Sequence, residues 1–361
     1  MIASAEWPSF ISPQDRNDSQ IAIQRIVDAL LVFKASFLFG AGMSKLCGLP
    51  SGFQLAVLMV AKYVQEPLLS QSTDKNDRNH LLEATAQAWP LECLAEVLSK
   101  KLGKGRADLT EFLNGLFIKP TPQLSEAHDL LVSIINSTGN RVSQLFTTNY
   151  DQLLERAIGE SKAVSIDHRN FNDITESQRM GKLPVIHLHG LPTDNDNYFI
   201  TEKDLYCDDY RIINDHFARE LYTSDAFVFV GYSMNDPDIR NIYLKYRQTF
   251  IDLARYQKSS YLVSPPSDLI SWVVGKEVWD CRNVKWIPLD ARSFFFLLKS
   301  CIEDYANKYI LAKAKKNFRT NDDEAFDDHV AKLQEIFQMD RSEVLSFLAN
   351  LQIPGTGDLK R

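Results

Sequence analysis

The chain has 361 residues, enough for one large α/β domain and an appended segment, with 45% hydrophobic and 24% charged residues as in ordinary globular proteins. Its net charge of −7 argues against a protein that binds nucleic acid along the whole chain. No apolar run approaches the ~20 residues that cross a bilayer, and the N-terminus lacks signal-peptide features, so we expect a cytoplasmic protein. Five single cysteines without a CxxC pair encode neither a disulfide framework nor a four-thiolate zinc site.

Helical and apolar segments alternate along the chain. An amphipathic helix is expected over 21–34, and helical spacing over about 53–140 predicts a helical insertion. Short apolar runs bounded by turn residues predict strands at 36–39, 142–147, 163–166, 185–189, 226–230, 260–263 and 284–288. This alternation predicts an α/β fold with a Rossmann-like, doubly wound parallel sheet.

The pattern becomes purely helical after Asp290. We therefore divide the chain into a nucleotide-binding domain (1–290) and a C-terminal helical extension (291–361). Two amphipathic segments in the extension carry Val330, Leu333, Ile336 and Phe337, and then Val344, Phe347, Leu348 and Leu351. Such helices either pack on the domain or form an oligomer or partner interface, and the sequence leaves both open.

The first motif leaves the first predicted strand as Gly40-Ala41-Gly42-Met43-Ser44. Glycines there allow the backbone to approach a pyrophosphate closely, and amides at the following helix start bind anions. The alternative is an ordinary tight strand-to-helix turn, which is about as common for a lone GxG.

The second motif, Thr147-Thr148-Asn149-Tyr150-Asp151, ends the next strand, where doubly wound folds place their ligand crevice. Helix capping explains one of the two polar side chains, Asn149 and Asp151, but not the whole run.

The third motif is His187-Leu188-His189-Gly190. Two histidines at strand spacing invite a metal interpretation, but no third ligand is evident, so no metal is expected. A histidine at a crevice edge suits proton transfer, and a half-buried structural imidazole is the alternative.

The fourth motif, residues 231–237 (GYSMNDP), follows the strand AFVFV, and Gly231 and Ser233 suit ribose and phosphate contacts. A capped turn is again the simpler explanation. Four such motifs at four strand ends are, however, better explained by one shared crevice than by four separate turns.

Together these motifs resemble the sirtuin superfamily over roughly residues 25–290. GAGMSKLCGLP is similar to its GAGxS…GIP opening, TTNYD to its TQNxD segment, HLHG to its His-Gly segment, and GYSMNDP to its late Gly-[Thr/Ser]-Ser strand end. Two features depart from sirtuin deacylases: only Cys207 lies where their zinc module would be, and 51–54 (SGFQ) replaces the Asp-Phe-Arg after GIP. The sequences TTNYD and GYSMNDP are instead similar to the corresponding segments of the zinc-free, sirtuin-like domains of bacterial anti-phage systems.

That resemblance implies an NAD+ hydrolase that releases nicotinamide and ADP-ribose and depletes NAD+ in abortive infection, with NAD+ as substrate and no zinc. It assigns Asn149 to the attacking water and ribose hydroxyls, His189 to the base, and Asp151 to the nicotinamide carboxamide. It assigns cofactor binding to Gly40, Ala41, Gly42, Ser44, Thr148, Gly231 and Ser233. It also implies a homo-oligomer or a partner such as a HerA-like ATPase or an Argonaute.

Competing hypotheses remain at this stage. A catalytically silent NAD+ or ADP-ribose sensor fits the same fold, whereas Asn149 and His189 together favour catalysis. This chain lacks the zinc module of a protein deacylase. It also lacks the third glycine of the GxGxxG pattern that is expected in a dehydrogenase. Direct nucleic-acid binding through Lys313, Lys315, Lys316 and Arg319 is not expected, because such runs are commonly solvated helix faces.

Overall fold

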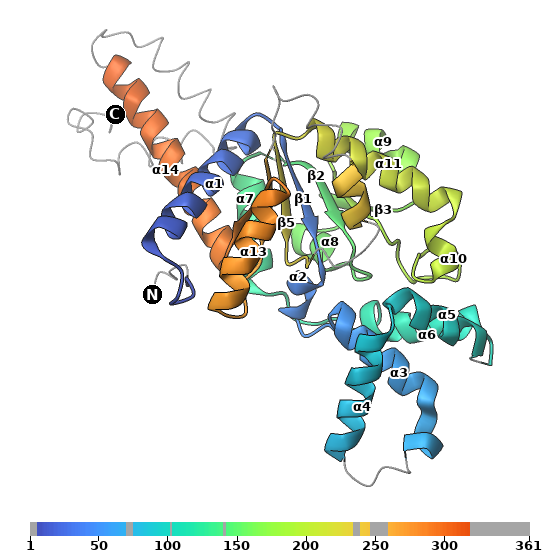
Figure 1. The fold of residues 1–361 in the computed structure, drawn as a ribbon. Coiled ribbons are helices and arrows are strands. Elements are labelled where there is room, and N and C mark those ends of the chain that lie inside the picture. The colour runs from blue at the N-terminus through green and yellow to red at the C-terminus, as the bar shows by residue number, and fades with distance from the viewer. Residues whose placement is uncertain are drawn as a thin grey trace.

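The computed structural model describes residues 6–69, 75–101, 103–139, 142–233, 239–245 and 259–317. At its centre is one seven-stranded sheet whose neighbouring strands are all parallel. Across the sheet the strands lie in the order β3 (Ala163–Ile166), β4 (Leu183–His187), β2 (Val142–Thr147), β1 (Ala35–Phe39), β5 (Ala226–Val230), β6 (Ser259–Val263) and β7 (Val284–Ile287). This order, with helices on both faces (Figure 1), confirms the predicted doubly wound α/β fold.

Two separate apolar cores cover the two faces of the sheet. Phe37 and Phe39 of β1 enter one core and Leu38 enters the other, as the alternation of a strand requires. The first core is covered by α1 (Pro13–Leu31), α7 (Glu126–Ser137), α8 (Leu153–Ile158) and α14 (Ala291–Asn317), and the second by α9 (Ile174–Arg179) and α11 (Asp208–Thr223). Because both faces are buried, the strands read in sequence as continuous apolar runs.

The shorter and peripheral elements complete this arrangement. They are α2 (Ala41–Lys45), the 3-10 helix η1 (Phe171–Asp173), α10 (Glu202–Leu205) and α13 (Leu269–Cys281). Helix α13 packs against β7, where the rings of Trp272 and Trp286 lie 5.1 Å apart.

Each predicted strand is present, and the bounds differ by at most one residue except at β4. The prediction that this strand runs to residue 189 is wrong, because the chain turns after His187. The Gly190 N–H donates to the His187 carbonyl at 3.1 Å, and Gly190 has φ +66°. His187 and His189 therefore do not share one face of a strand.

Four helices form a second body beside the sheet, at the lower right of Figure 1. They are α3 (Gly52–Leu69), α4 (Lys75–Ala88), α5 (Leu91–Lys101) and α6 (Arg106–Phe117). Leu55, Leu98 and Leu113 belong to a core cluster of their own, which also reaches Tyr150 and Tyr198 of the main body. The segment predicted as an insertion over about 53–140 thus holds these helices and also α7, which packs against α14 over the sheet.

The order of the strands creates a switch point beside β1. From β1 the chain proceeds to β2 and β4 on one side, and it later returns to place β5 on the other side. In open α/β sheets the ligand crevice lies at such a point, outside the carboxyl ends of the strands. The loops that follow β1 and β5 are therefore the first place to look for a site.

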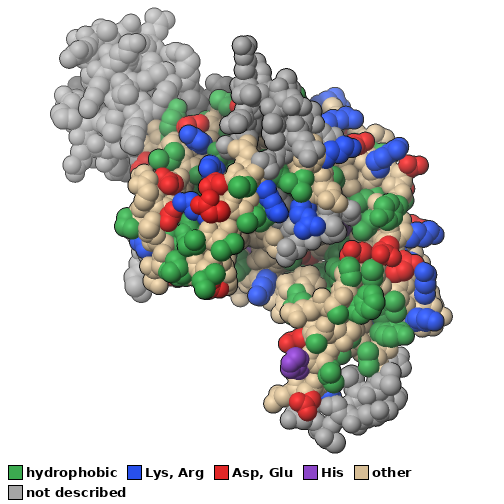
Figure 2. Space-filling view, in the orientation of Figure 1, with side chains coloured by type: hydrophobic (Ala, Val, Ile, Leu, Met, Phe, Trp, Pro, Cys, Tyr) green, Lys and Arg blue, Asp and Glu red, His purple; other side chains and the backbone are tan. Residues whose placement is uncertain are grey.

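The first turns of α14 are part of the main core, because Phe294, Phe295 and Leu298 are fully buried there. The division of the chain at residue 290 remains a prediction, and the two amphipathic segments predicted beyond residue 329 lie outside the described residues. Among the described helices, none has the length and apolarity to cross a bilayer. On the face drawn in Figure 2, the described Lys and Arg side chains lie interspersed with Asp and Glu.

One histidine is buried uncharged at the start of α7. The Nδ1 atom of His128 lies 2.8 Å from Ser125 Oγ and 3.7 Å from Cys47 Sγ. Burial, with a smaller contribution from the charge of Arg156, lowers the pKa of His128 to about 4.

This buried histidine predicts a specific loss of stability in acid. Below pH ~6.5 the unfolded chain protonates this imidazole while the folded chain does not, so the free energy of unfolding falls by up to about 3 kcal/mol as the pH drops towards ~4. We expect a His128→Gln variant to lack this component. Urea unfolding of both proteins between pH 7 and 4 measures it, and parallel pH curves would contradict the assignment.

Candidate active site

Three glycines allow the loops after β1 and β5 to touch at the switch point. The Gly40 N–H donates to the Val230 carbonyl at 3.0 Å, and the Gly42 N–H donates to the Gly231 carbonyl at 2.8 Å. A Cβ atom on Gly40 or Gly42 would lie 2.7 Å from the Gly231 oxygen, and Gly231 itself has φ +61°. Close contact between the two loops therefore requires glycine at all three positions.

Asn149 reaches into this loop contact from the end of β2. Its Nδ2 atom donates to Ser44 Oγ at 2.8 Å and to the Gly40 carbonyl at 3.1 Å. Because a carbonyl only accepts hydrogen bonds, the contact with Gly40 fixes which way the amide is turned. Both amide protons of this half-buried side chain are thus directed at protein acceptors, and Oδ1 is the atom that remains for a ligand.

Ser44 and Asp151 form a buried layer beneath Asn149. Ser44 Oγ donates to Asp151 Oδ2 at 2.6 Å, and the Leu153 N–H donates to Oδ1 at 3.0 Å. Burial raises the pKa of Asp151, and the hydrogen bond from Ser44 opposes that rise. With 4% of its surface exposed, Asp151 supports Ser44 from below and does not itself line the surface.

The two histidines of the third motif have different surroundings. His187 is fully buried, and its Nε2 lies 2.7 Å from Glu155 Oε1. His189 is half-buried in the turn beyond the strand, with its ring centroid 6.0 Å from that of Tyr150 and 6.2 Å from that of Tyr210. Of the two, only His189 is partly exposed, and its Nε2 atom is itself buried.

The remaining predicted contacts lie around the same loops. Ala41, Gly42, Thr148 and Gly231 are half-buried and Ser233 is exposed, whereas Gly40 and Ser44 are buried. Residues 234–237 of the fourth motif lie outside the described part of the chain. Among the described residues, no group of three or more His, Cys, Asp and Glu side chains is arranged to hold a metal ion.

An antiparallel bridge supports the segment that carries His189. Gly190 bridges to Tyr198, and the Phe199 N–H donates to the His189 carbonyl at 2.8 Å. From the other side, Tyr150 Oη donates to the Phe199 carbonyl at 2.7 Å. The position of His189 therefore depends on residues 198–199, ten positions along the chain.

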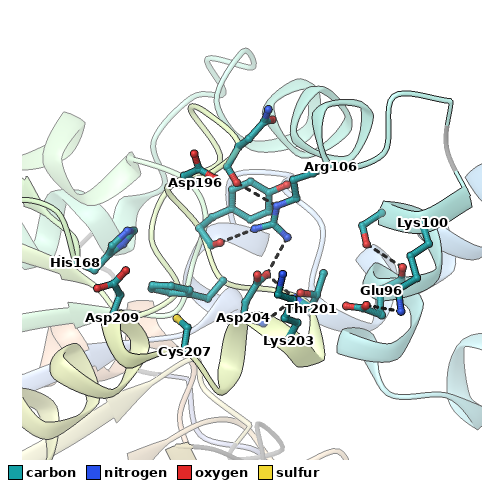
Figure 3. Close-up of a pocket in the computed structure, with 14 residues that line it drawn as sticks. Glu96, Lys100, Arg106, His168, Asp196, Thr201, Lys203, Asp204, Cys207 and Asp209 are labelled. Atoms are coloured by element: carbon teal, nitrogen blue, oxygen red, sulfur yellow. Dashed lines mark hydrogen bonds and ion pairs between the residues drawn. The ribbon is translucent and has the colours of Figure 1, made fainter.

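Arg106, the first residue of α6, anchors that partner segment to the helical insertion (Figure 3). Its guanidinium donates to Asp204 at 2.8 Å and to the Tyr198 carbonyl at 2.7 Å, and it lies 3.9 Å from the centre of the Tyr198 ring. These residues border a cavity of about 590 Å³ between α5 and α10, which contains none of the predicted site residues. Neither Arg106 nor Glu155 was predicted, because only the tertiary fold brings them to the site.

Residues 143–284 match the family described as the SIR2-like domain. The match spans Asn149, His189 and Gly231, which follow β2, β4 and β5. Over this region the chain is similar to a SIR2-like domain.

Two curated relatives resemble this chain and carry the name NAD(+) hydrolase ThsA. The protein from Enterococcus faecium is 25% identical over 228 residues, covering 62% of this chain and 42% of the relative. The protein from Acinetobacter baumannii (strain 532279) is 26% identical over 256 residues, covering 68% and 45%. The matched region is thus less than half of either relative.

Solved Sir2 structures share lower sequence identity with this chain. A Sir2 homologue in complex with NAD is 16% identical with a TM-score of 0.44, covering 77% of this chain and 93% of its own. A second, from work on the mechanism and regulation of Sir2 enzymes, is 15% identical with a TM-score of 0.42, covering 78% and 97%.

The glycine contact predicts a contrast in stability between two alanine substitutions. Gly42→Ala places a methyl group 2.7 Å from the Gly231 oxygen, so the loops must separate, at a cost of roughly 1–3 kcal/mol. The control Gly115→Ala lies in the interior of α6 with nothing within 4 Å, and we expect it to stabilise the protein by up to about 1 kcal/mol. Denaturant unfolding measures both. Equal stability of the two variants would show that the loops are not in contact.

Proposed function

We propose that this chain hydrolyses NAD+ to nicotinamide and ADP-ribose at the strand-end site. The observation that carries the proposal is the geometry of Asn149, whose amide protons are both bound by the protein while its Oδ1 is left for a ligand. The half-buried imidazole of His189 stands at the next strand end. The names of the two curated relatives support the same reaction.

Cleavage of nicotinamide from NAD+ requires little acid–base catalysis. Nicotinamide leaves as a neutral molecule, because the electron pair of the breaking C–N bond returns to the pyridinium nitrogen. No general acid is therefore needed, unlike in glycosidases, whose leaving group must be protonated. What remains is to hold the ribose, to place a water against the oxocarbenium-like carbon, and to accept the proton of that water.

The site residues suit these tasks. Oδ1 of Asn149 accepts a hydrogen bond from the attacking water or a ribose hydroxyl and orients it. His189 accepts the proton that the water releases as the new C–O bond forms. Ala41, Gly42 and Thr148 face the pyrophosphate, and Gly231 and Ser233 face the ribose of the adenosine half, with Gly40 and Ser44 supporting them from the buried side.

Asp151 is assigned a role at the nicotinamide end. Its carboxylate is occupied by Ser44 and by the Leu153 N–H. Each oxygen of this carboxylate can accept a second hydrogen bond, so contact with the nicotinamide carboxamide, which the resemblance implies, requires the carboxamide N–H to reach the carboxylate beside these donors. Through Ser44 the same carboxylate also fixes Asn149.

We further propose that the reaction depletes NAD+ during phage infection. The resemblance of TTNYD and GYSMNDP to zinc-free anti-phage domains supports this role, as does the name ThsA of the relatives. Assembly into a homo-oligomer, or with a HerA-like ATPase or an Argonaute, belongs to the same proposal.

The proposal is tested by nicotinamide release from NAD+ by the purified chain, with an acetylated peptide in a parallel reaction. We expect peptide-independent release that falls by ~10²–10⁴ in Asn149→Ala and in His189→Ala, as for loss of a placed base or water-binding group. His80→Ala, an exposed histidine on the distant helix α4, is the control and should behave as wild type.

Two results would reject the hydrolase. Binding of NAD+ without release, alone and in the presence of cell lysate, would favour a sensor. Release that requires the acetylated peptide would favour a deacylase.

A further inference from the structure

We propose that Glu155 and His187, a buried pair outside the predicted site, are positioning residues for Asn149; this inference rests on the proposed function. His187 is the last residue of β4 and Glu155 lies in α8. Besides its contact with Glu155, His187 places Nδ1 at 3.2 Å from the backbone carbonyl of Asn149. The pair therefore contacts the residue that we expect to orient the substrate.

The hydrogen-bond partners fix the protons of this pair. The Asn149 carbonyl only accepts, so Nδ1 of His187 must carry a proton and donate it. Nε2 faces Glu155 Oε1 at 2.7 Å, and that oxygen also accepts from Ser165 Oγ at 2.5 Å. One further proton thus lies between Nε2 and Oε1, and the carboxylate ensures that the imidazole keeps its proton on Nδ1.

Charge attraction reinforces the arrangement. Burial acts to lower the pKa of His187, but the charge and hydrogen bond of Glu155, together with the contact to the Asn149 carbonyl, outweigh it, so the pKa is raised. Burial likewise acts to raise the pKa of Glu155, but the charge and hydrogen bond of His187, together with the hydrogen bond from Ser165, outweigh it, so the pKa is lowered. Both directions favour an imidazolium paired with a carboxylate, a pair whose net charge is zero.

Asn149 lies beyond the last residue of β2, so the sheet alone does not fix its peptide groups. Its N–H donates to Thr147 Oγ1 at 3.0 Å, its carbonyl accepts from His187, and its side chain is held by Ser44 and Gly40. Without the bond from His187 the peptide after Asn149 is free to turn, and Oδ1 moves with it. Displacement by about 1 Å is enough to cost ~10²-fold in rate.

The chain offers a matched control at the opposite end of the same sheet. Glu220 of α11 is also a buried carboxylate, and it accepts hydrogen bonds from Ser36 Oγ at 2.6 Å and Ser143 Oγ at 2.7 Å. Ser36 and Ser143 are the second residues of β1 and β2, whereas Asn149 follows the carboxyl end of β2. A change at Glu220 thus affects stability without reaching the site.

The test replaces the pair by apolar residues of similar size. Such replacements of buried ion pairs are often neutral or stabilising, so Glu155→Leu combined with His187→Leu should fold while lacking the donor to Asn149. We expect kcat for nicotinamide release to fall by ~10–100-fold with KM changed by less than about threefold. Glu220→Leu should lower the melting temperature and leave kcat unchanged. His187→Lys, in a chain that keeps Glu155, should have most of the wild-type activity, because its ammonium can donate to both Glu155 and the Asn149 carbonyl.

The outcomes separate this inference from the function on which it rests. A wild type that releases no nicotinamide overturns both. An active wild type with a stable, equally active double variant overturns the positioning role alone. If the double variant does not fold, NMR of wild-type protein labelled with ¹⁵N-histidine decides the question. Addition of ADP-ribose should shift the Nδ1 resonance of His187 and leave that of His128 unchanged. An unchanged His187 resonance overturns the inference.

Discussion

The contact between the loops after β1 and β5 is the constraint on which the site depends. Gly40, Gly42 and Gly231 approach so closely that a Cβ atom on any of them would meet backbone within 2.7 Å. This contact leaves the Gly40 carbonyl and Ser44 within reach of Asn149 on the neighbouring strand. The glycines therefore have a structural role even before any nucleotide is considered, and the same closeness gives a pyrophosphate access to the backbone amides.

Beneath the open residues lies a second, buried polar layer formed by Ser44, Asp151, Glu155 and His187. Hydrogen bonds within this layer connect it to Asn149 from both sides, through Ser44 and through the backbone carbonyl. Apart from Oε2 of Glu155, which has no hydrogen-bond partner among the described residues, the buried side-chain oxygen and nitrogen atoms of this layer are paired. Such pairing favours a single geometry, because another arrangement would leave further unpaired groups in an apolar surrounding. The layer thus prepares Asn149 for a ligand before the ligand arrives, which is how a site lowers the cost of orienting water and ribose.

The sequence predicted the sheet well because its strands depend on local signals. Strands buried on both faces are continuous apolar runs, and polar residues at their carboxyl ends converge by topology alone. The end of β4 was misplaced because Leu188 is apolar and buried like a strand residue, whereas the chain already turns after His187, whose carbonyl accepts from the Gly190 N–H. Glu155 and Arg106 were missed because each is an ordinary charged helix residue in sequence, and only the packing of distant elements gives it a partner.

Asn149 and His189 are held by different parts of the molecule. Asn149 follows a central strand and is fixed by the sheet, the glycine loops and His187. His189 stands in a turn whose partner segment is bound by Arg106 of the helical insertion. The insertion contributes none of the motif residues, yet its contact with Tyr198 supports the turn that carries His189, the partly exposed histidine of the third motif. A site assembled from two such supports requires both bodies to be in place, so the docking of the insertion is itself a condition of the proposed catalysis.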